Sequence, residues 1–186
     1  MTGNDYRKWV GNYIASAYGS RGLVVYEEVQ LGTSIIGKQR RIDLLIIAPD
    51  QTALVVECKY QDSAGTADEK IPYALNDMAA LRVPGVLVYA GSGFSPGVLH
   101  LLQGSEFGAY CMPEPGQSAP QSRRAGAMDS GTWQFDHVVA QTFRFWDIVL
   151  GNRRPLQADP NLNFASPEAP QQESLLALVA NRDPVK

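Results

Sequence analysis

The sequence predicts an α/β fold in which a helix, three successive strands, a second helix and a fourth strand follow one another. The first observation is a run of aromatic and aliphatic residues at helical spacing over residues 5–18. The second is a set of short runs rich in Val, Leu and Ile, separated by turns that contain Gly, Pro or Asp. The third is length: 186 residues can bury a sizeable core in one domain without disulfides.

The first half of this pattern is a helix followed by a three-stranded meander. Asn4 or Asp5 is the expected N-cap of the first helix, and Gly19 and Gly22 close it. Between later Gly-containing and Asp-containing turns, three segments have the composition of strands. These predicted strands cover residues 23–31, 40–48 and 53–60.

The second half of the pattern is a helix, a buried strand and a further short helix. Thr66 and Glu69 have the spacing of a capping box, which would start the helix there. Proline is tolerated only in the first turn of a helix, so a helix that starts at Pro72 is the alternative. Either helix runs to about Arg82. The apolar segment "PGVLVYAG" predicts a strand buried on both faces, and "SPGVLHLLQG" predicts the helix after it.

Periodicity is weaker beyond Gly104. Residues 113–131 are rich in Pro, Gly and Ser and predict a long loop. Apolar residues at helical spacing from about Asp136 to Leu150 predict another helix, and "ESLLALVA" predicts a short terminal one that packs back or pairs with another subunit.

Composition excludes several classes of protein. No stretch approaches the length of an apolar membrane span, and the first residues lack a secretory signal, so we expect a cytoplasmic protein. Cys58 and Cys111 form no metal knuckle and are expected to be reduced. The net charge of −3 argues against nucleic-acid binding through the overall field, but local patches remain possible. Basic residues do occur together, at Lys38, Arg40 and Arg41, at Arg123 and Arg124, and at Arg153 and Arg154.

The segment "GSGFSPG", residues 91–97, follows a strand and precedes a helix, as a dinucleotide-binding turn does. Its glycines are one residue too widely spaced for that fingerprint, so a tight turn is the simpler interpretation.

The segment "VVECKYQ", residues 55–61, places an acid and a base in an apolar strand. Glu57 and Lys59 project from one face because strand side chains alternate. If the preceding turn is centred on Asp50, Asp43 lies directly opposite Glu57, and two carboxylates there need a cation such as Mg²⁺. A register shifted by one residue would instead put Asp43 opposite Cys58.

This arrangement resembles the PD-(D/E)XK nuclease superfamily, whose fold is restriction endonuclease-like. Asp43 in "RIDLLI" matches the acid of its motif, and Glu57 and Lys59 in "VVECKY" match its Glu-x-Lys. The predicted helices and strands over residues 5–103 resemble its αβββαβ core. The proline of the motif is absent before Asp43, where Arg41 and Ile42 stand, as is common among members.

The resemblance implies a metal-dependent mechanism. Asp43, Glu57 and the backbone carbonyl of Cys58 would hold Mg²⁺, with Mn²⁺ able to substitute, and Lys59 would orient the attacking water. We further expect Gln61 to contact that water or the phosphate. Glu28 is a candidate ligand for a second metal ion, although a solvated strand residue is the simpler interpretation. Lys70 is expected to reach a phosphate from the start of the second helix.

The leading hypothesis is a Mg²⁺-dependent DNA endonuclease of restriction, mobile-element or phage-associated type that leaves 5′-phosphate ends. We expect one nuclease domain over residues 1–186, with a catalytic core over 1–103, and variable elements over 104–186 for DNA contact and oligomerisation. Cleavage of both strands of double-stranded DNA implies a homodimer or tetramer. The residues expected to contact DNA are Lys38, Arg40, Arg41, Lys70, Arg123 and Arg124.

Two alternatives stay open. One is a non-catalytic DNA-binding module, or a partner-dependent subunit of a defence or transposition complex, with the same fold. The other concerns Glu57 and Lys59 alone, which could be an ordinary ion pair on the surface of an edge strand.

Overall fold

The computed structural model describes residues 1–159, apart from 64, 66, 125 and 128. The chain divides into two units, Met1–Arg153 and Arg154–Lys186. Of the second unit, residues 154–159 are described, and they are exposed and have no regular secondary structure. The predicted single domain over 1–186, with its core at 1–103, stays a prediction.

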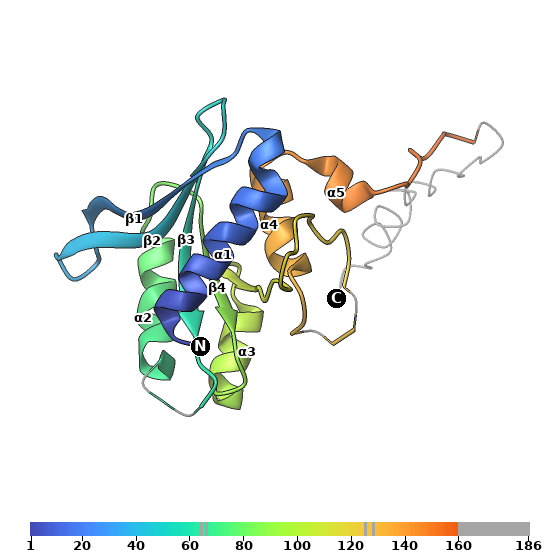
Figure 1. The fold of residues 1–186 in the computed structure, drawn as a ribbon. Helices are drawn as coiled ribbons and strands as arrows, with labels where there is room; N and C mark the ends of the chain where they lie inside the picture. The colour runs from blue at the N-terminus through green and yellow to red at the C-terminus, as the bar shows by residue number, and fades with distance from the viewer. Residues whose placement is uncertain (64, 66, 125, 128, 160–186) are drawn as a thin grey trace, which may run out of the picture. The chain divides into compact units, whose positions relative to one another are not determined.

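The first unit is built on a mixed sheet of five strands in the order β1-β2-β3-β4-β5, which confirms the predicted α/β class (Figure 1). The first three strands are antiparallel, and β3, β4 and β5 are parallel. The strands are β1 (Val24–Thr33), β2 (Gln39–Ile47), β3 (Ala53–Tyr60), β4 (Gly85–Ala90) and β5 (Gly108–Tyr110). The sequence did not predict β5, because three residues are too few to show a period.

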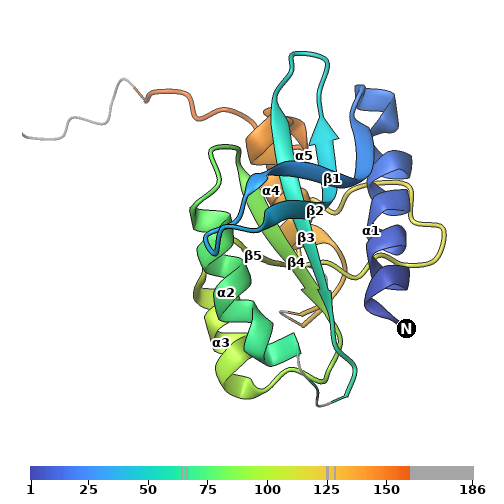
Figure 2. The ribbon, with the colours of Figure 1, turned by 90° about the vertical axis from the view of Figure 1, so that its left-hand side faces the viewer.

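Helices cover both faces of this sheet (Figures 1 and 2). One face carries α1 (Gly3–Tyr18) and α4 (Trp133–Phe143), whose apolar side chains form one core with inward residues of the strands. The other face carries α2 (Ala67–Ala79) and α3 (Pro96–Gly104), which pack on β4. The helix α5 (Trp146–Leu150) follows α4. No helix in the described part of the chain is long and apolar enough to cross a bilayer.

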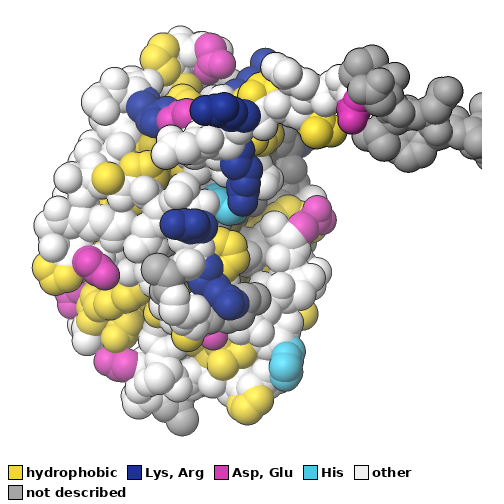
Figure 3. Space-filling view, turned by 90° about the vertical axis from the view of Figure 1, so that its right-hand side faces the viewer, with side chains coloured by type: hydrophobic (Ala, Val, Ile, Leu, Met, Phe, Trp, Pro, Cys, Tyr) yellow, Lys and Arg dark blue, Asp and Glu magenta, His cyan; other side chains and the backbone are white. Residues whose placement is uncertain are grey.

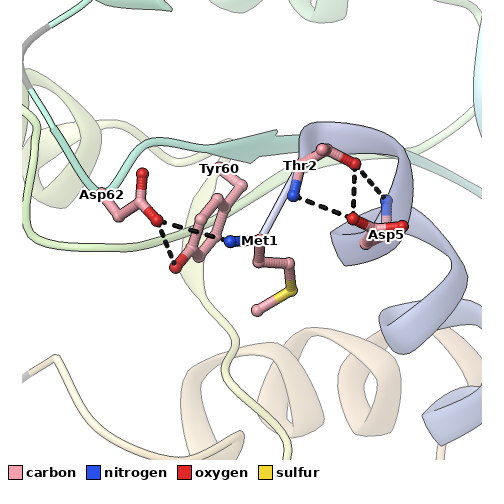
Figure 4. Close-up of polar contacts among 5 residues, drawn as sticks. All are labelled: Met1, Thr2, Asp5, Tyr60 and Asp62. Atoms are coloured by element: carbon pink, nitrogen blue, oxygen red, sulfur yellow. Dashed lines mark hydrogen bonds and ion pairs between the residues drawn. The ribbon is translucent and has the colours of Figure 1, made fainter.

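The first helix begins at Gly3, two residues earlier than the sequence predicted (Figure 4). Its N-cap is Thr2, and Asp5 completes a capping box as the third helical residue: the Asp5 N–H donates to Thr2 Oγ1 at 3.1 Å, and the Thr2 N–H donates to Asp5 Oδ2 at 3.0 Å. Asn4 and Asp5 are therefore not the N-cap. The Met1 ammonium and the Tyr60 hydroxyl both contact Asp62, which ties the helix start to the end of β3.

Two later helices differ from the prediction. The second helix begins at Ala67 and ends at Ala79, so Pro72 lies inside it and a start at Pro72 is wrong. The helix expected from Asp136 to Leu150 is two helices, because Arg144 adopts a left-handed conformation with φ of 62° and ends α4. Thr66 and the segment "ESLLALVA" lie outside the described residues.

The turn after β4 explains the glycines of "GSGFSPG" by close packing of backbone. Gly91 has φ of +106°, and a Cβ there would lie 2.1 Å from the carbonyl oxygen of Gln61. The Gly93 N–H donates to that same carbonyl at 2.8 Å. Only glycine fits this approach of two backbones, which supports the interpretation as a tight turn.

Candidate active site

The site lies where the pairing of β2 and β3 stops. The two strands pair from Ile47↔Ala53 to Leu44↔Val56, so the next position in that register places Asp43 opposite Glu57, as predicted. At this point the N–H of Cys58 donates to Asp43 Oδ2 at 2.8 Å. A carboxylate thus replaces a backbone carbonyl as the acceptor, and the ladder ends in two acidic side chains.

Both β1 and β2 are irregular at this level. Ile42 packs in the core beneath α2, with Val55 and Met78, whereas Leu44 packs in the core beneath α1. Since residues two apart in a regular strand share a face, β2 turns over at Asp43. The β1 position that the register places beside Asp43 is Glu28, whose φ is 56°. The side chain of Asp43 therefore does not follow the regular alternation of side chains along β2.

Glu57 and Lys59 form an ion pair on the α2 face of the central strand β3. Lys59 Nζ lies 2.5 Å from Glu57 Oε1, and the side chains are only 19% and 20% exposed, respectively. Burial raises the pKa of Glu57, the charge of Asp43 adds to that rise, and Lys59 opposes it. This pair is largely removed from solvent on a central strand, which argues against the alternative of an ordinary ion pair on an edge strand.

A cavity of about 400 Å³ opens over this pair. Its walls are the hairpin between β1 and β2 on one side and α2 on the other (Figure 2). Five basic residues and two acidic ones line it, so its charge is positive on balance. The charged lining residues are Lys38, Arg40, Arg41, Lys59, Lys70, Glu57 and Asp77.

The structure thus brings together four of the six residues expected to contact DNA. Two of the four, Lys38 and Lys70, make no ion pair within the described residues. Arg40 instead donates two hydrogen bonds to Asp77, at 2.7 and 2.9 Å, and this pair clamps the hairpin to α2. Arg41 Nη2 lies 2.5 Å from Glu28 Oε2. The other two, Arg123 and Arg124, belong to a loop outside this cavity.

The carboxylate of Glu28 is held by two guanidinium groups. Arg7 from α1 and Arg41 from β2 both pair with it, and their hydrogen bonds, that of Arg7 first, lower its pKa. Glu28 therefore has partners other than a metal ion, and its role as a ligand stays a prediction. Sequence reasoning missed Arg7, although its position three residues before the buried Val10 placed it on the inward side of the helix.

Gln61 lies just beyond the end of β3 and is buried. Its amide nitrogen donates to Asp68 at 3.0 Å and to the Gly93 carbonyl at 2.8 Å. These bonds hold the first turn of α2 against the turn that precedes α3. The structure thus gives this amide nitrogen a structural role. The expected contact of Gln61 with a hydrolytic water stays a prediction.

The donor set fits a hard divalent cation that retains several waters. Over the described residues, no three His, Cys, Asp or Glu side chains are grouped for metal binding. Asp43 and Glu57 are close enough for the charge of Asp43 to raise the pKa of Glu57. The Cys58 thiol is buried in the core beneath α1 and is free, so its backbone carbonyl is the group available to an ion. Mg²⁺ often binds through only one or two carboxylates.

Comparisons with known proteins agree with a nuclease fold. The family model described as "PD-(D/E)XK nuclease superfamily domain" matches residues 2–146. Among solved structures, a repair endonuclease from Pyrococcus abyssi is 20% identical with a TM-score of 0.34, covering 57% of this chain and 46% of that one. The EndoMS–dsDNA2 complex is 18% identical with a TM-score of 0.33, covering 56% and 42%.

A third similar structure is the SPO1766 protein of unknown function from Silicibacter pomeroyi, which is 14% identical with a TM-score of 0.38, covering 85% of this chain and 99% of that one. The chain spans less than half the length of the two endonuclease structures. No curated protein matches it. Because the family model covers most of the chain, the chain belongs to the PD-(D/E)XK nuclease superfamily, whose members generally use divalent metals.

Proposed function

We propose that this nuclease is a Mg²⁺-dependent endonuclease that hydrolyses phosphodiester bonds of double-stranded DNA and leaves 5′-phosphate ends. The observation that supports it best is the meeting of Asp43, Glu57 and Lys59 beside a basic cavity at the end of the β2–β3 ladder. A restriction, mobile-element or phage-associated role in the cytoplasm is the biological setting that we favour.

Asp43, Glu57 and the carbonyl of Cys58 would hold the metal ion. When bound, Mg²⁺ supplies positive charge that stabilises the phosphate oxygens and lowers the pKa of a water molecule, and Mn²⁺ has the same chemistry. Asp43 is positioned for this by the N–H of Cys58, which engages one of its oxygens. Glu57 is positioned by Lys59.

Lys59 has the chemistry of the third catalytic group. Its ammonium carries three donors, and the structure assigns one to Glu57. The remaining donors are available to a water or a phosphate oxygen in the cavity. Charge placed in advance where negative charge develops is the main contribution that a protein makes to phosphoryl transfer.

DNA binding would use the cations along the cavity walls. Lys38 on the hairpin and Lys70 on α2 are the pair that we assign to phosphates, because neither is engaged by an acid in the described structure. Such contacts position the duplex without reading its sequence. Since one centre cuts one strand, we propose a homodimer or a tetramer for double-strand cleavage.

The test is cleavage of supercoiled and linear duplex DNA with Mg²⁺, Mn²⁺ or EDTA. We expect wild type to cut only with metal, and Asp43→Ala and Lys59→Ala to be inactive but folded by circular dichroism. Lys8→Ala, exposed on α1 and outside the cavity, is the matched control and should cut like wild type. Ligation of the fragments without prior kinase treatment would verify the 5′-phosphate.

A folded wild-type protein that binds DNA but never cuts it would contradict the proposal. That outcome would favour the alternative, a non-catalytic or partner-dependent subunit. Equal cleavage by wild type and Lys59→Ala would show that the activity comes from a contaminating nuclease.

A further inference from the structure

A second basic cavity, of about 580 Å³, lies on another part of the first unit. The loop before α4 supplies Arg123, α4 supplies His137, and the segment after α5 supplies Arg153. None of its lining residues is acidic. Figure 3 views the side of the molecule on which α4 and α5 lie in Figure 1, and it shows Lys and Arg side chains gathered down the middle, with a His among them.

Contacts from different elements hold this cavity together. His137 Nε2 lies 2.9 Å from the Ser122 carbonyl oxygen, which fastens the loop to α4. The His137 ring also packs edge-on against Trp133. Arg153 Nη1 donates to the Val149 carbonyl at 3.3 Å, which keeps its guanidinium beside the end of α5. Arg123 and Arg153 therefore line the same cavity although they are far apart in sequence.

The basic residues here differ from those of the catalytic cavity in their partners. There, Arg40, Arg41 and Lys59 are each engaged by an acid. Here, Arg123, Arg124 and Arg153 are exposed and make no ion pair with any described residue. Because no carboxylate cancels their charge, this surface has a local positive potential despite the net charge of −3.

The two cavities face opposite sides of the first unit. The catalytic cavity lies between the β1–β2 hairpin and α2, which face the viewer in Figure 2, whereas Figure 3 views the molecule from the opposite side. A straight duplex in the catalytic cavity therefore does not reach Arg123 or Arg153. A nucleic acid bound in the second cavity is therefore a different segment from one bound in the catalytic cavity.

We propose that the surface of Arg123, Arg124 and Arg153 is a second, non-catalytic site for the phosphate backbone of duplex DNA, so that one chain holds two DNA segments. Guanidinium groups match phosphate oxygens in pairs, and several along an exposed surface suit a polymer with repeated phosphates better than a single small anion. The half-exposed Leu150 adds apolar surface for deoxyribose contacts. The identity of the polymer as DNA rests on the proposed function.

The experiment is a measurement of binding stoichiometry with the full chain, in EDTA so that no cleavage occurs. The probe is a duplex of about 12 base pairs, just over one helical turn, so that one duplex cannot occupy both sides. By isothermal titration and native mass spectrometry, we expect two duplexes per chain for wild type. Arg123→Glu with Arg153→Glu should bind one, and Lys38→Glu with Lys70→Glu should also bind one.

A matched control keeps the overall charge change the same. Lys8→Glu with Arg82→Glu reverses two exposed charges that line neither cavity, and it should still bind two duplexes. A longer duplex should show a log–log salt slope reduced by about two in the Arg123→Glu, Arg153→Glu variant, since each phosphate contact contributes about one unit.

Two results would overturn the second site: one duplex per chain for wild type, or two for folded Arg123→Glu with Arg153→Glu. In either case, normal metal-dependent cleavage would leave the proposed function intact. If wild type binds no duplex and cuts none, the proposed function fails together with the inference.

Discussion

The carboxylate of Asp43 accepts a hydrogen bond from the backbone N–H of Cys58, at 2.8 Å, across the end of the β2–β3 ladder. Regular pairing stops one residue earlier, at Leu44↔Val56, so Asp43 satisfies a backbone donor that the ladder leaves over. A partly buried N–H without an acceptor would cost free energy. Asp43 therefore has a structural role in addition to its proposed role in metal binding.

Replacing Asp43 should separate these two roles. Asp43→Asn keeps an oxygen for the Cys58 N–H but removes the charge, so we expect at least a ~100-fold loss of cleavage and a change in unfolding free energy below about 1 kcal/mol. Asp43→Ala should lose cleavage equally and cost a further ~1–2 kcal/mol. Single-turnover cleavage and urea unfolding of both variants measure this. Wild-type cleavage by Asp43→Asn would exclude Asp43 as a metal ligand.

The pair of Glu57 and Lys59 should be coupled in stability. Lys59→Met leaves a largely buried Glu57 facing Asp43 without its cation, so we expect destabilisation of about 1–3 kcal/mol together with loss of cleavage. Glu57→Gln should restore part of the stability in the double variant. Urea unfolding of wild type, both single variants and the double variant gives the coupling energy, expected to exceed about 0.5 kcal/mol. Additive effects would mean that the two groups do not interact in solution.

The sequence predicted those parts of the site that depend on neighbouring strands. The strand at 53–60 has a clear apolar pattern, and the short turn beside Asp50 determines which residue opposes Glu57. Local patterns therefore sufficed to bring Asp43, Glu57 and Lys59 together.

Contacts between distant segments could not be predicted in this way. Gln61 continues the spacing of Glu57 and Lys59, but the strand ends at Tyr60, and its amide finds Asp68 and Gly93 instead. The partners Arg7 of Glu28 and Asp77 of Arg40 are 21 and 37 residues away, respectively, and depend on how helices dock on the sheet. The ends of helices also depend on contacts between distant segments. The helix α2 begins before Pro72, and Asp68 in its first turn accepts a hydrogen bond from the backbone N–H of Ser95.

The pair of Asp77 and Arg40 should make stability depend on pH in the acid range. The hydrogen bond from Arg40 is the main cause that lowers the pKa of Asp77 in the folded state below its ordinary 3.8. Its stabilisation is therefore complete above that ordinary value and is lost as the pH falls through the lower folded-state pKa. We expect Asp77→Asn to cost about 1–3 kcal/mol at neutral pH, with the difference from wild type shrinking at acid pH.

Urea unfolding across this pH range measures the effect. Glu69→Gln, at an exposed position of the same helix, is the control and should differ little from wild type at any pH. A cost for Asp77→Asn that stays constant down to the acid limit would show that its charge does not stabilise the clamp between the hairpin and α2.

The turn after β4 offers a matched pair of glycine substitutions. Gly91→Ala places a Cβ 2.1 Å from the carbonyl oxygen of Gln61, at φ of +106°, so the chain must move at the end of the strand that carries Lys59. We expect a loss of at least about 2 kcal/mol in unfolding free energy. Gly97→Ala, in the first turn of α3, meets nothing within 4 Å and should stabilise the protein by up to about 1 kcal/mol. Thermal unfolding of both variants measures the contrast. Equal stability of the two would show that residues 61–63 and 91–93 do not pack as closely in solution as the structure places them.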